Sequence, residues 1–184
     1  EIATLYRASA QLLAPASDLK ELALRIAGVV VQEFELVECG IWLLVEGESV
    51  LRRVAYSGSA WVEDFEDISL NGIGLIVAAA RTGQAAYAPD VRLDPRYLEG
   101  DPNTRSELSV PLRTRERVIG VINMESAELN AFSERDRRVL TAFAEQAALA
   151  LENTQLLVSL EQAVQRANEL AVAAEEASRI KSQF

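Results

Sequence analysis

The chain has 184 residues, of which 49% are hydrophobic, and it carries a formal net charge of −10 at pH 7. This length suits one domain with an extension, and the apolar share is sufficient for a hydrophobic core. The acidic balance argues against nucleic-acid binding, which needs a clustered basic face, and the absence of histidine removes the commonest general base and the usual haem and zinc ligand.

The first third of the chain predicts two helices followed by a β-hairpin. One helix is expected over residues 2–13, before Pro15, and a second over residues 19–34, whose apolar positions keep helical spacing. Two β-rich runs at 37–45 and 50–56 flank a short loop that contains glycine, which is typical of a hairpin. Both faces of the first run are mostly apolar, so this strand should lie inside a sheet that is covered on both sides.

The middle of the chain is expected to be less regular. Glycines introduce a short helix that ends near residue 80, a short strand follows at 84–88, and residues 90–103 form a polar loop. A second hairpin is expected from strands at 105–112 and 117–125. The order and lengths of these elements predict an α+β fold with a mainly antiparallel sheet, with helices from both chain ends on one face and loops on the other.

Residues 133–184 predict a single long helix that extends beyond the domain. Ser133 and Asp136 have the spacing of a capping box, and no proline or glycine follows them. At 1.5 Å per residue such a helix would be roughly 75 Å long. A helix that projects from its domain usually connects it to something else, so signal transmission is the first functional hypothesis. Because the chain starts at Glu1 and stops inside this helix, we expect it to be a piece of a longer protein.

An apolar stripe along this helix predicts a coiled-coil homodimer. Alternating spacings of four and three repeat over about four heptads, which is the pattern of a left-handed coiled coil. The stripe is wider than a two-stranded seam, so residues 2–13 are expected to cover part of it. Its later layers are mostly alanine and bury little area, so the helix pair could shift register at modest cost. The expected dimerisation residues are Leu149, Asn153, Leu156, Leu160, Ala163, Ala167 and Leu170.

Several segments, taken together, resemble a GAF domain over roughly residues 4–157. The main ones are Ser-Glu-Leu-Ser-Val-Pro-Leu at 106–112, Ile-Gly-Val-Ile-Asn-Met-Glu at 119–125 and Phe-Ser-Glu-Arg-Asp at 132–136. Residues 175–184 are similar to the segment that leads into the dimerisation helix of sensor histidine kinases. The resemblance implies a small ligand held between the sheet and the irregular loops, whose occupancy is relayed through a dimeric helix.

The resemblance also implies a domain organisation and a cellular setting. Residues 1–16 are interpreted as an N-terminal signalling and dimerisation helix, 17–157 as the GAF-like sensory domain, and 158–184 as a coiled-coil helix towards an output domain. The expected protein is a cytoplasmic histidine kinase whose kinase domain follows in the same chain. The fragment itself is not expected to be an enzyme, because no nucleophile has a base beside it and no metal cluster is evident. No apolar run is long enough to cross a bilayer.

The cofactors of several GAF branches fit this sequence poorly. A covalently bound bilin needs a cysteine on the pocket side, whereas Cys39, the single cysteine, begins the first strand on the face expected to lie beneath the helices. Haem is disfavoured because histidine is absent. The sulfoxide-reductase branch needs several cysteines, and one cysteine cannot make a disulfide cycle. The cyclic-nucleotide signature is matched only loosely, by Asn130, Phe132 and Asp136.

The remaining candidate is a pocket lined by aromatic and small polar side chains. The sheet and loops would supply its aromatic and apolar wall, and two polar residues would offer hydrogen bonds. A second interpretation stays open, in which the aromatic residues fill a closed core and the domain serves only dimerisation and signal relay. The candidate ligand-binding residues are Trp42, Tyr56, Trp61, Phe65, Ile73, Tyr87, Tyr97, Ser109 and Asn123.

Overall fold

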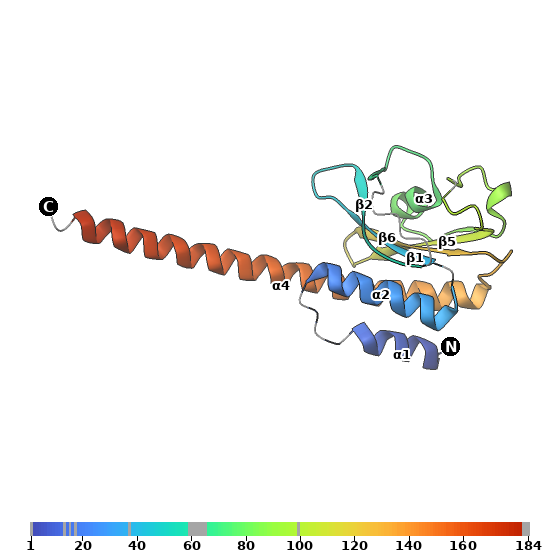
Figure 1. Cartoon of the computed structure of the whole chain (residues 1–184), viewed down its shortest axis with the longest axis horizontal. Helices are drawn as coiled ribbons and strands as arrows, with labels where there is room; N and C mark the ends of the chain where they lie inside the picture. Colours follow the sequence, from blue (N-terminus) through green and yellow to red (C-terminus); the bar gives the residue numbers. More distant parts are fainter. Residues whose placement is uncertain are drawn as a thin grey trace.

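A six-stranded antiparallel sheet forms the centre of the computed structural model, which describes residues 2–12, 14, 16, 18–36, 38–58, 66–98 and 100–181 (Figure 1). The strand order is β3-β2-β1-β6-β5-β4. The two predicted hairpins, β1–β2 and β5–β6, therefore lie side by side and join through β1 and β6. The strands are β1 (Glu38–Leu44), β2 (Val50–Gly58), β3 (Ile68–Ser69), β4 (Ala86–Ala88), β5 (Ser106–Arg113) and β6 (Val118–Ser126).

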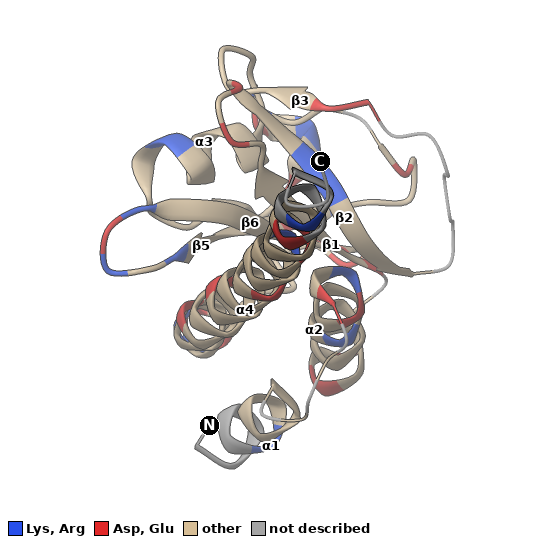
Figure 2. Cartoon of the chain, turned by 90° about the vertical axis from the view of Figure 1, so that its left-hand side faces the viewer, with Lys and Arg blue, Asp and Glu red and all other residues tan. Residues whose placement is uncertain are grey.

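Helices from both chain ends cover one face of the sheet, as predicted. α2 (Leu19–Phe34) and the first part of α4 (Glu134–Lys181) lie against the strands, and α1 (Ile2–Leu12) packs on both helices as an outer layer (Figure 2). Alternation along the strands directs one set of side chains into this layer. The core there includes Leu22, Ile26, Cys39, Ile41, Leu108, Val110, Ile122, Met124, Leu140 and Phe143.

The opposite face of the sheet is only partly covered. The short helix α3 (Leu75–Thr82) contacts β4, β5 and β6, where Leu75 and Ala79 pack with Val121 in a smaller apolar cluster. The 3₁₀ turn η1 (Val91–Leu93) adds Val91 to this cluster. The part of the face formed by β1 and β2 lies beside α3 rather than beneath it, and this arrangement leaves room for a cavity.

The predicted capping box is confirmed at the start of α4. The Asp136 backbone N–H donates to Ser133 Oγ at 3.2 Å, and the Ser133 backbone N–H donates to Asp136 Oδ2 at 3.0 Å. The two side chains are also joined directly, since Ser133 Oγ donates to Asp136 Oδ2 at 2.6 Å. These bonds satisfy backbone donors that have no partner within the helix.

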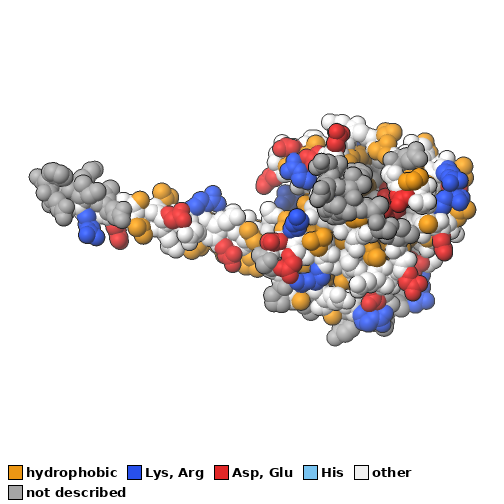
Figure 3. Space-filling view, viewed as in Figure 1, with side chains coloured by type: hydrophobic (Ala, Val, Ile, Leu, Met, Phe, Trp, Pro, Cys, Tyr) orange, Lys and Arg blue, Asp and Glu red, His pale blue; other side chains and the backbone are white. Residues whose placement is uncertain are grey.

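α4 is a single helix of 48 residues that leaves the domain after about Leu151 (Figures 1 and 3). At 1.5 Å per residue it is about 72 Å long. All of the expected dimerisation residues are exposed in the single chain, and Leu156 and Leu160 expose 61% and 60% of their surface. The expectation that the N-terminal helix covers part of this stripe is wrong for these residues, because α1 packs on the domain end of α4 through Ala8 and Leu12.

Two short elements were not expected from the sequence. β3 has only two residues and pairs with the edge of β2, and it follows Asp67, which forms an ion pair with Arg52 at 2.6 Å. η1 lies in the stretch expected to be a loop, and its first turn is capped by Asp90, which accepts a hydrogen bond from the Arg92 backbone at 3.1 Å. Elements of two or three residues are too short to show a hydrophobic period.

Candidate functional site

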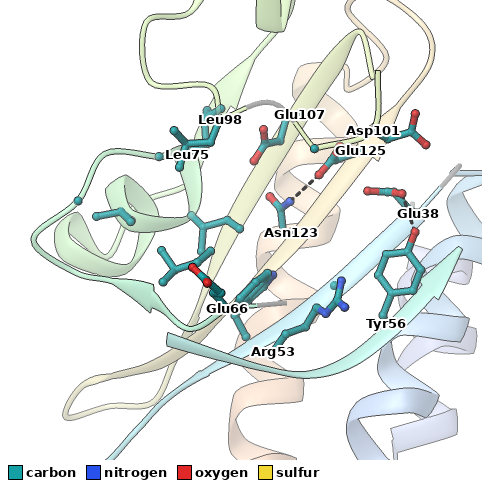
Figure 4. A pocket seen from close by; sticks show the side chains of 18 of the residues that line it. Glu38, Arg53, Tyr56, Glu66, Leu75, Leu98, Asp101, Glu107, Asn123 and Glu125 are labelled. Atoms are coloured by element: carbon teal, nitrogen blue, oxygen red, sulfur yellow. Dashed lines mark hydrogen bonds between the residues drawn. The ribbon is translucent and has the colours of Figure 1, made fainter. Parts of the chain in front are cut away.

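A cavity of about 1030 Å³ lies between the open face of the sheet, β3, the start of α3 and the loop at 98–103. Strands β1, β2, β5 and β6 contribute its floor, and α3 contributes an apolar side (Figure 4). The floor carries mostly polar side chains, and the other walls carry mostly apolar ones. The floor residues are Glu38, Gly40, Trp42, Arg53, Tyr56, Glu107, Asn123 and Glu125, and the apolar wall includes Ile68, Ile73, Leu75, Ile76, Val77 and Leu98.

Strand register places three glutamates side by side in the floor. Glu125 on β6 pairs with Glu38 on β1 and with Glu107 on β5. Residues paired in this way have Cβ atoms about 4.5–5.5 Å apart and point to the same face of the sheet. All three side chains line the cavity (Figure 4). We call Glu38, Glu125 and Glu107 the glutamate row.

Hydrogen bonds hold the glutamate row in place. Tyr56 Oη donates to Glu38 Oε2 at 2.6 Å, and Thr104 Oγ1 donates to Glu125 Oε2 at 2.6 Å. Asn123 Nδ2 donates to Glu125 Oε1 at 3.2 Å. Glu38 therefore has one oriented donor and Glu125 has two, and the positions of the groups are set by the sheet.

The next row of the floor fixes the direction of the Asn123 amide. Asn123 pairs with Gly40 on one side and with Ser109 on the other. Ser109 Oγ donates to Asn123 Oδ1 at 2.6 Å, so the amide nitrogen is left to face Glu125. Gly40 leaves space in this row, and the Trp42 ring lies next to it.

Burial and mutual repulsion raise the pKa values of two glutamates in the row. Glu107 is 5% exposed, and desolvation followed by the charge of Glu125 raises its pKa to about 8. Desolvation followed by the charge of Glu38 raises the pKa of Glu125 to about 7. The Thr104, Ser109 and Asn123 hydrogen bonds act in the opposite direction but are smaller causes. The two side chains therefore hold protons at pH values where an exposed glutamate is ionised.

Arg53 places a positive charge on the β2 side of the cavity. Its guanidinium lies 5.1 Å from the centroid of the Tyr56 ring and 6.0 Å from that of the Trp42 ring. Contacts of this kind stabilise a cation by its attraction to the aromatic faces. The cavity thus combines a glutamate row, one arginine held by aromatic rings, and an apolar side formed by α3.

The structure places the predicted site residues in three different environments. Trp42, Tyr56, Ile73 and Asn123 line the cavity, and Ser109 lies behind Asn123, fully buried. Tyr97 packs against the α3 cluster and is not among the described lining residues. Trp61 and Phe65 lie outside the described residues.

The placement of Tyr87 corrects the sequence-based expectation of a pocket residue. It pairs with Leu108, whose side chain lies in the helix-covered core, so Tyr87 points away from the cavity. Its ring meets that of Phe132 edge-on at 6.0 Å, and its hydroxyl donates to Asn130 Oδ1 at 2.9 Å. Tyr87 therefore packs against the helix-covered core, in agreement with the interpretation that aromatic residues fill the core. Asn130, considered above for nucleotide recognition, accepts this bond instead.

Sequence reasoning missed Glu38, Arg53, Glu107 and Glu125. The signal was available, because side chains two positions apart on a strand share a face. Glu107 precedes Ser109 by two residues, and Glu125 follows Asn123 by two. Ser109 and Asn123 were both assigned to the pocket side, so the same alternation assigns the glutamates to it. The sequence pattern thus places carboxylates of two neighbouring strands on the cavity side, next to the polar residues predicted there.

Within the part of the chain that the structure describes, no group of three or more cysteine, aspartate or glutamate side chains is placed to hold a metal ion. The same residues include no helix with the length and apolar character needed to cross a membrane. Cys39 is fully buried, and desolvation raises the pKa of its thiol, so it behaves as a core residue.

Comparison with known families gives one match over most of the chain. A family model described as "GAF domain" matches residues 16–152. Protein YtsP of Bacillus subtilis is 32% identical over 80 residues, which are 44% of this chain and 49% of that protein. The chain therefore spans only about half the length of this relative.

Two solved structures show the same fold. The type II free methionine-R-sulfoxide reductase from Thermoplasma acidophilum is 29% identical, with a TM-score of 0.65 over 74% of this chain and 97% of that one. The GAF domain of an Acinetobacter phosphoenolpyruvate-protein phosphotransferase is 19% identical, with a TM-score of 0.75 over 86% of this chain and 96% of that one. The same fold therefore occurs in proteins whose names describe different activities.

Proposed function

The chain belongs to the GAF domain family, whose fold is regulatory or sensory, and we propose that it binds a small amine-bearing ligand and relays its presence through α4. The single observation that carries this proposal is the glutamate row, which directs carboxyl groups from three neighbouring strands into one cavity. Three carboxyl groups at partly or fully buried neighbouring positions cost free energy unless something compensates their charge. A ligand that supplies positive charge and hydrogen-bond donors would balance them.

A protonated amine fits the chemistry of the cavity. An ammonium group has three N–H donors and no acceptor, and carboxyl oxygens are its preferred partners. The apolar side formed by α3 would receive a short hydrocarbon tail, and Arg53 would receive an acidic group if the ligand carries one. The similar reductase from Thermoplasma acidophilum is named for a free amino acid, methionine-R-sulfoxide, which supports a ligand of this class.

Strand β5 offers a route from the cavity to the start of α4. Glu107 faces the cavity, whereas its neighbour Ser106 holds the loop before α4 by donating to the Glu128 carbonyl at 2.8 Å and accepting from the Ala131 N–H at 3.4 Å. A ligand that shifts β5 would therefore shift the anchor of that loop. In this proposal the ligand favours one of two arrangements of α4 because it binds them with different affinity.

The exposed part of α4 supports a dimeric output. Leu149 exposes 56% of its surface although its neighbours Ala148 and Leu151 are buried, and this side of the helix continues through Leu156 and Leu160. Isolated helices with such a stripe are marginal in water, whereas a second copy would cover it. We propose that two chains pair along this stripe, and that a histidine kinase domain in the same cytoplasmic protein receives the signal.

The test is a thermal-shift screen of the purified protein with small primary amines and amino acids. Each compound is paired with its N-acetyl derivative, which keeps the shape and removes the charge. The proposal expects stabilisation by some amines and by none of their acetylated partners, because a ligand at 100 times its Kd adds about 2.7 kcal/mol. No stabilisation by any amine, with an intact dimer, would favour the alternative of a ligand-free dimerisation and relay domain.

A further inference from the structure

Among the described residues that line the cavity, acidic groups outnumber the one arginine. The charged residues among its described lining are Glu38, Glu66, Asp67, Asp101, Glu107, Glu125 and Arg53. Asp67 is already paired with Arg52 outside the row. The remaining acidic groups include the whole glutamate row, which the strand register holds at fixed spacing.

The groups that face the row include Arg53, which attracts Glu38, and Arg96, which attracts Glu107, but the pKa values of Glu107 and Glu125 stay raised in their presence. From β2, Tyr56 Oη donates to Glu38, and Arg53 lies against the aromatic rings. The 94–104 stretch faces the row with Asp101, Thr104 and Tyr97, and with Arg96, which is held by Asp94 through bonds of 2.9 and 2.6 Å. α3 contributes only the apolar Leu75, Ile76 and Val77 to the lining.

We propose that the glutamate row holds protons before a ligand binds and that a cationic ligand enters in exchange for one of them. The ammonium brings one positive charge, the carboxylic acid at Glu107 or Glu125 gives its proton to the buffer, and the charge inside the cavity stays the same. No covalent bond is made or broken except the O–H bond of that acid. This inference rests on the proposed function, since it concerns the same site.

The exchange makes the domain responsive to pH as well as to its ligand. Like charges on directly paired strand positions repel, and the low exposure of Glu107 removes the water that would screen them. The raised pKa values of Glu107 and Glu125, about 8 and about 7, agree with this geometry. If binding releases one proton, the ligand affinity should weaken about tenfold for each unit by which the pH is lowered below that range.

The test uses the chain labelled with ¹³C at the glutamate side-chain carboxyl carbons, titrated by NMR. The expected result is two carboxyl signals that titrate near pH 7 to 8, apart from the other glutamates. Glu107→Gln and Glu125→Gln should each remove one late signal and move the other towards lower pH, because the two groups titrate together. The exposed Glu46→Gln should leave both in place.

A second titration contains n-pentylammonium, with n-pentanol as the uncharged control of similar shape. The exchange predicts that the amine lowers both late midpoints by one pH unit or more and that the alcohol does not. Ordinary midpoints for every glutamate, or late midpoints that the amine leaves unchanged, would overturn the exchange. Either result can occur while other amines stabilise the protein in the thermal screen, so failure here is distinct from failure of the proposed function.

Discussion

Glu107 and Glu125 face each other on the neighbouring strands β5 and β6, and both side chains reach the same cavity. Such a pair costs stability when both groups are ionised, because each carboxylate is desolvated and repelled by the other. Thr104 donates a hydrogen bond to Glu125 at 2.6 Å, which reduces this cost without removing it. Local arrangements that oppose stability are common at sites with a function.

The first prediction concerns stability between pH 5.5 and pH 8.5. The pKa values of Glu107 and Glu125 are higher in the folded chain than the ordinary 4.5, so the folded state binds more protons than the unfolded state in this range. Stability should therefore fall as pH rises through about 7 to 8. We expect a loss of roughly 5 kcal/mol between these pH values, measured by urea unfolding, because each pH unit over which a proton is bound only in the folded state costs about 1.4 kcal/mol.

Glu107→Gln is the matched variant for this prediction. It keeps the shape and removes the ionisable group, so it should be more stable than the wild type at pH 8.5 and should flatten the pH dependence. Asp67 and Asp94, whose pKa values their arginine partners lower, remain ionised throughout this range and do not contribute. A wild-type protein that is at least as stable at pH 8.5 as at pH 5.5 would contradict the prediction.

The second prediction compares two glycines. A Cβ at Gly120 on β6 would collide with the Trp42 carbonyl oxygen on the neighbouring strand, whereas a Cβ at Gly28 in α2 meets nothing within 4 Å. Gly120→Ala should lower the free energy of unfolding by roughly 3 kcal/mol, since a backbone atom cannot move aside as a flexible side chain can. Gly28→Ala should raise it by about 0.5–1 kcal/mol. Urea unfolding measures the free energy of unfolding of both variants. If the two substitutions change it by the same amount, the strands at Gly120 can move apart to accept the methyl group.

The fold was largely readable from the sequence because its elements have clear periods and clear ends. α2 has the predicted bounds, from Leu19 to Phe34, where Glu35 ends it with a left-handed backbone. The patterns at 37–45 and 117–125 also predicted β1 and β6, the two central strands of the sheet, to within two residues at each end. β3 was not predictable, because its pairing depends on the tertiary position of β2 and on the Arg52–Asp67 contact.

The site was harder to predict than the fold, because the sequence pattern does not show which strands become neighbours in the sheet. Trp42 and Asn123 were expected to line the pocket, and both line the cavity. The proximity of Glu38 to Glu125 needs the β1–β6 pairing, which joins these two residues across 87 positions of the chain. Tyr87 was misplaced since a strand of three residues shows no alternation from which its face could be read.

The third prediction concerns the start of α4. Ser133→Ala removes the acceptor for the Asp136 backbone N–H and the direct bond between the two side chains. It should lower the free energy of unfolding by about 1 kcal/mol, the usual cost of losing such a cap. Ser133→Thr keeps a hydroxyl that can both accept from the Asp136 backbone N–H and donate to the Asp136 carboxylate, so it should recover most of this loss. If both variants unfold at the same urea concentration as the wild type, the helix start does not depend on this cap.

The fourth prediction concerns the proposed dimer. Leu160→Glu places a charge at an exposed leucine in the middle of the stripe and should weaken self-association at least tenfold, as measured by sedimentation equilibrium. Gln162→Glu adds the same charge two residues further on, at an exposed position outside the stripe, and should change the association by less than twofold. The domain should remain folded in both, because neither side chain contacts it.

The alanine layers of the stripe allow the opposite test, in which substitutions should strengthen the dimer. Ala163 and Ala167 are exposed in the single chain and lie in the same stripe, so changing both to leucine adds apolar area that only a second helix can cover. Their replacement should tighten the dimer, at about 25 cal/mol for each Å² of added buried surface, and should hold the helix pair in one register. A monomeric wild type, or equal weakening by Leu160→Glu and Gln162→Glu, would remove the coiled coil from the proposed mechanism and leave the cavity as its only supported part.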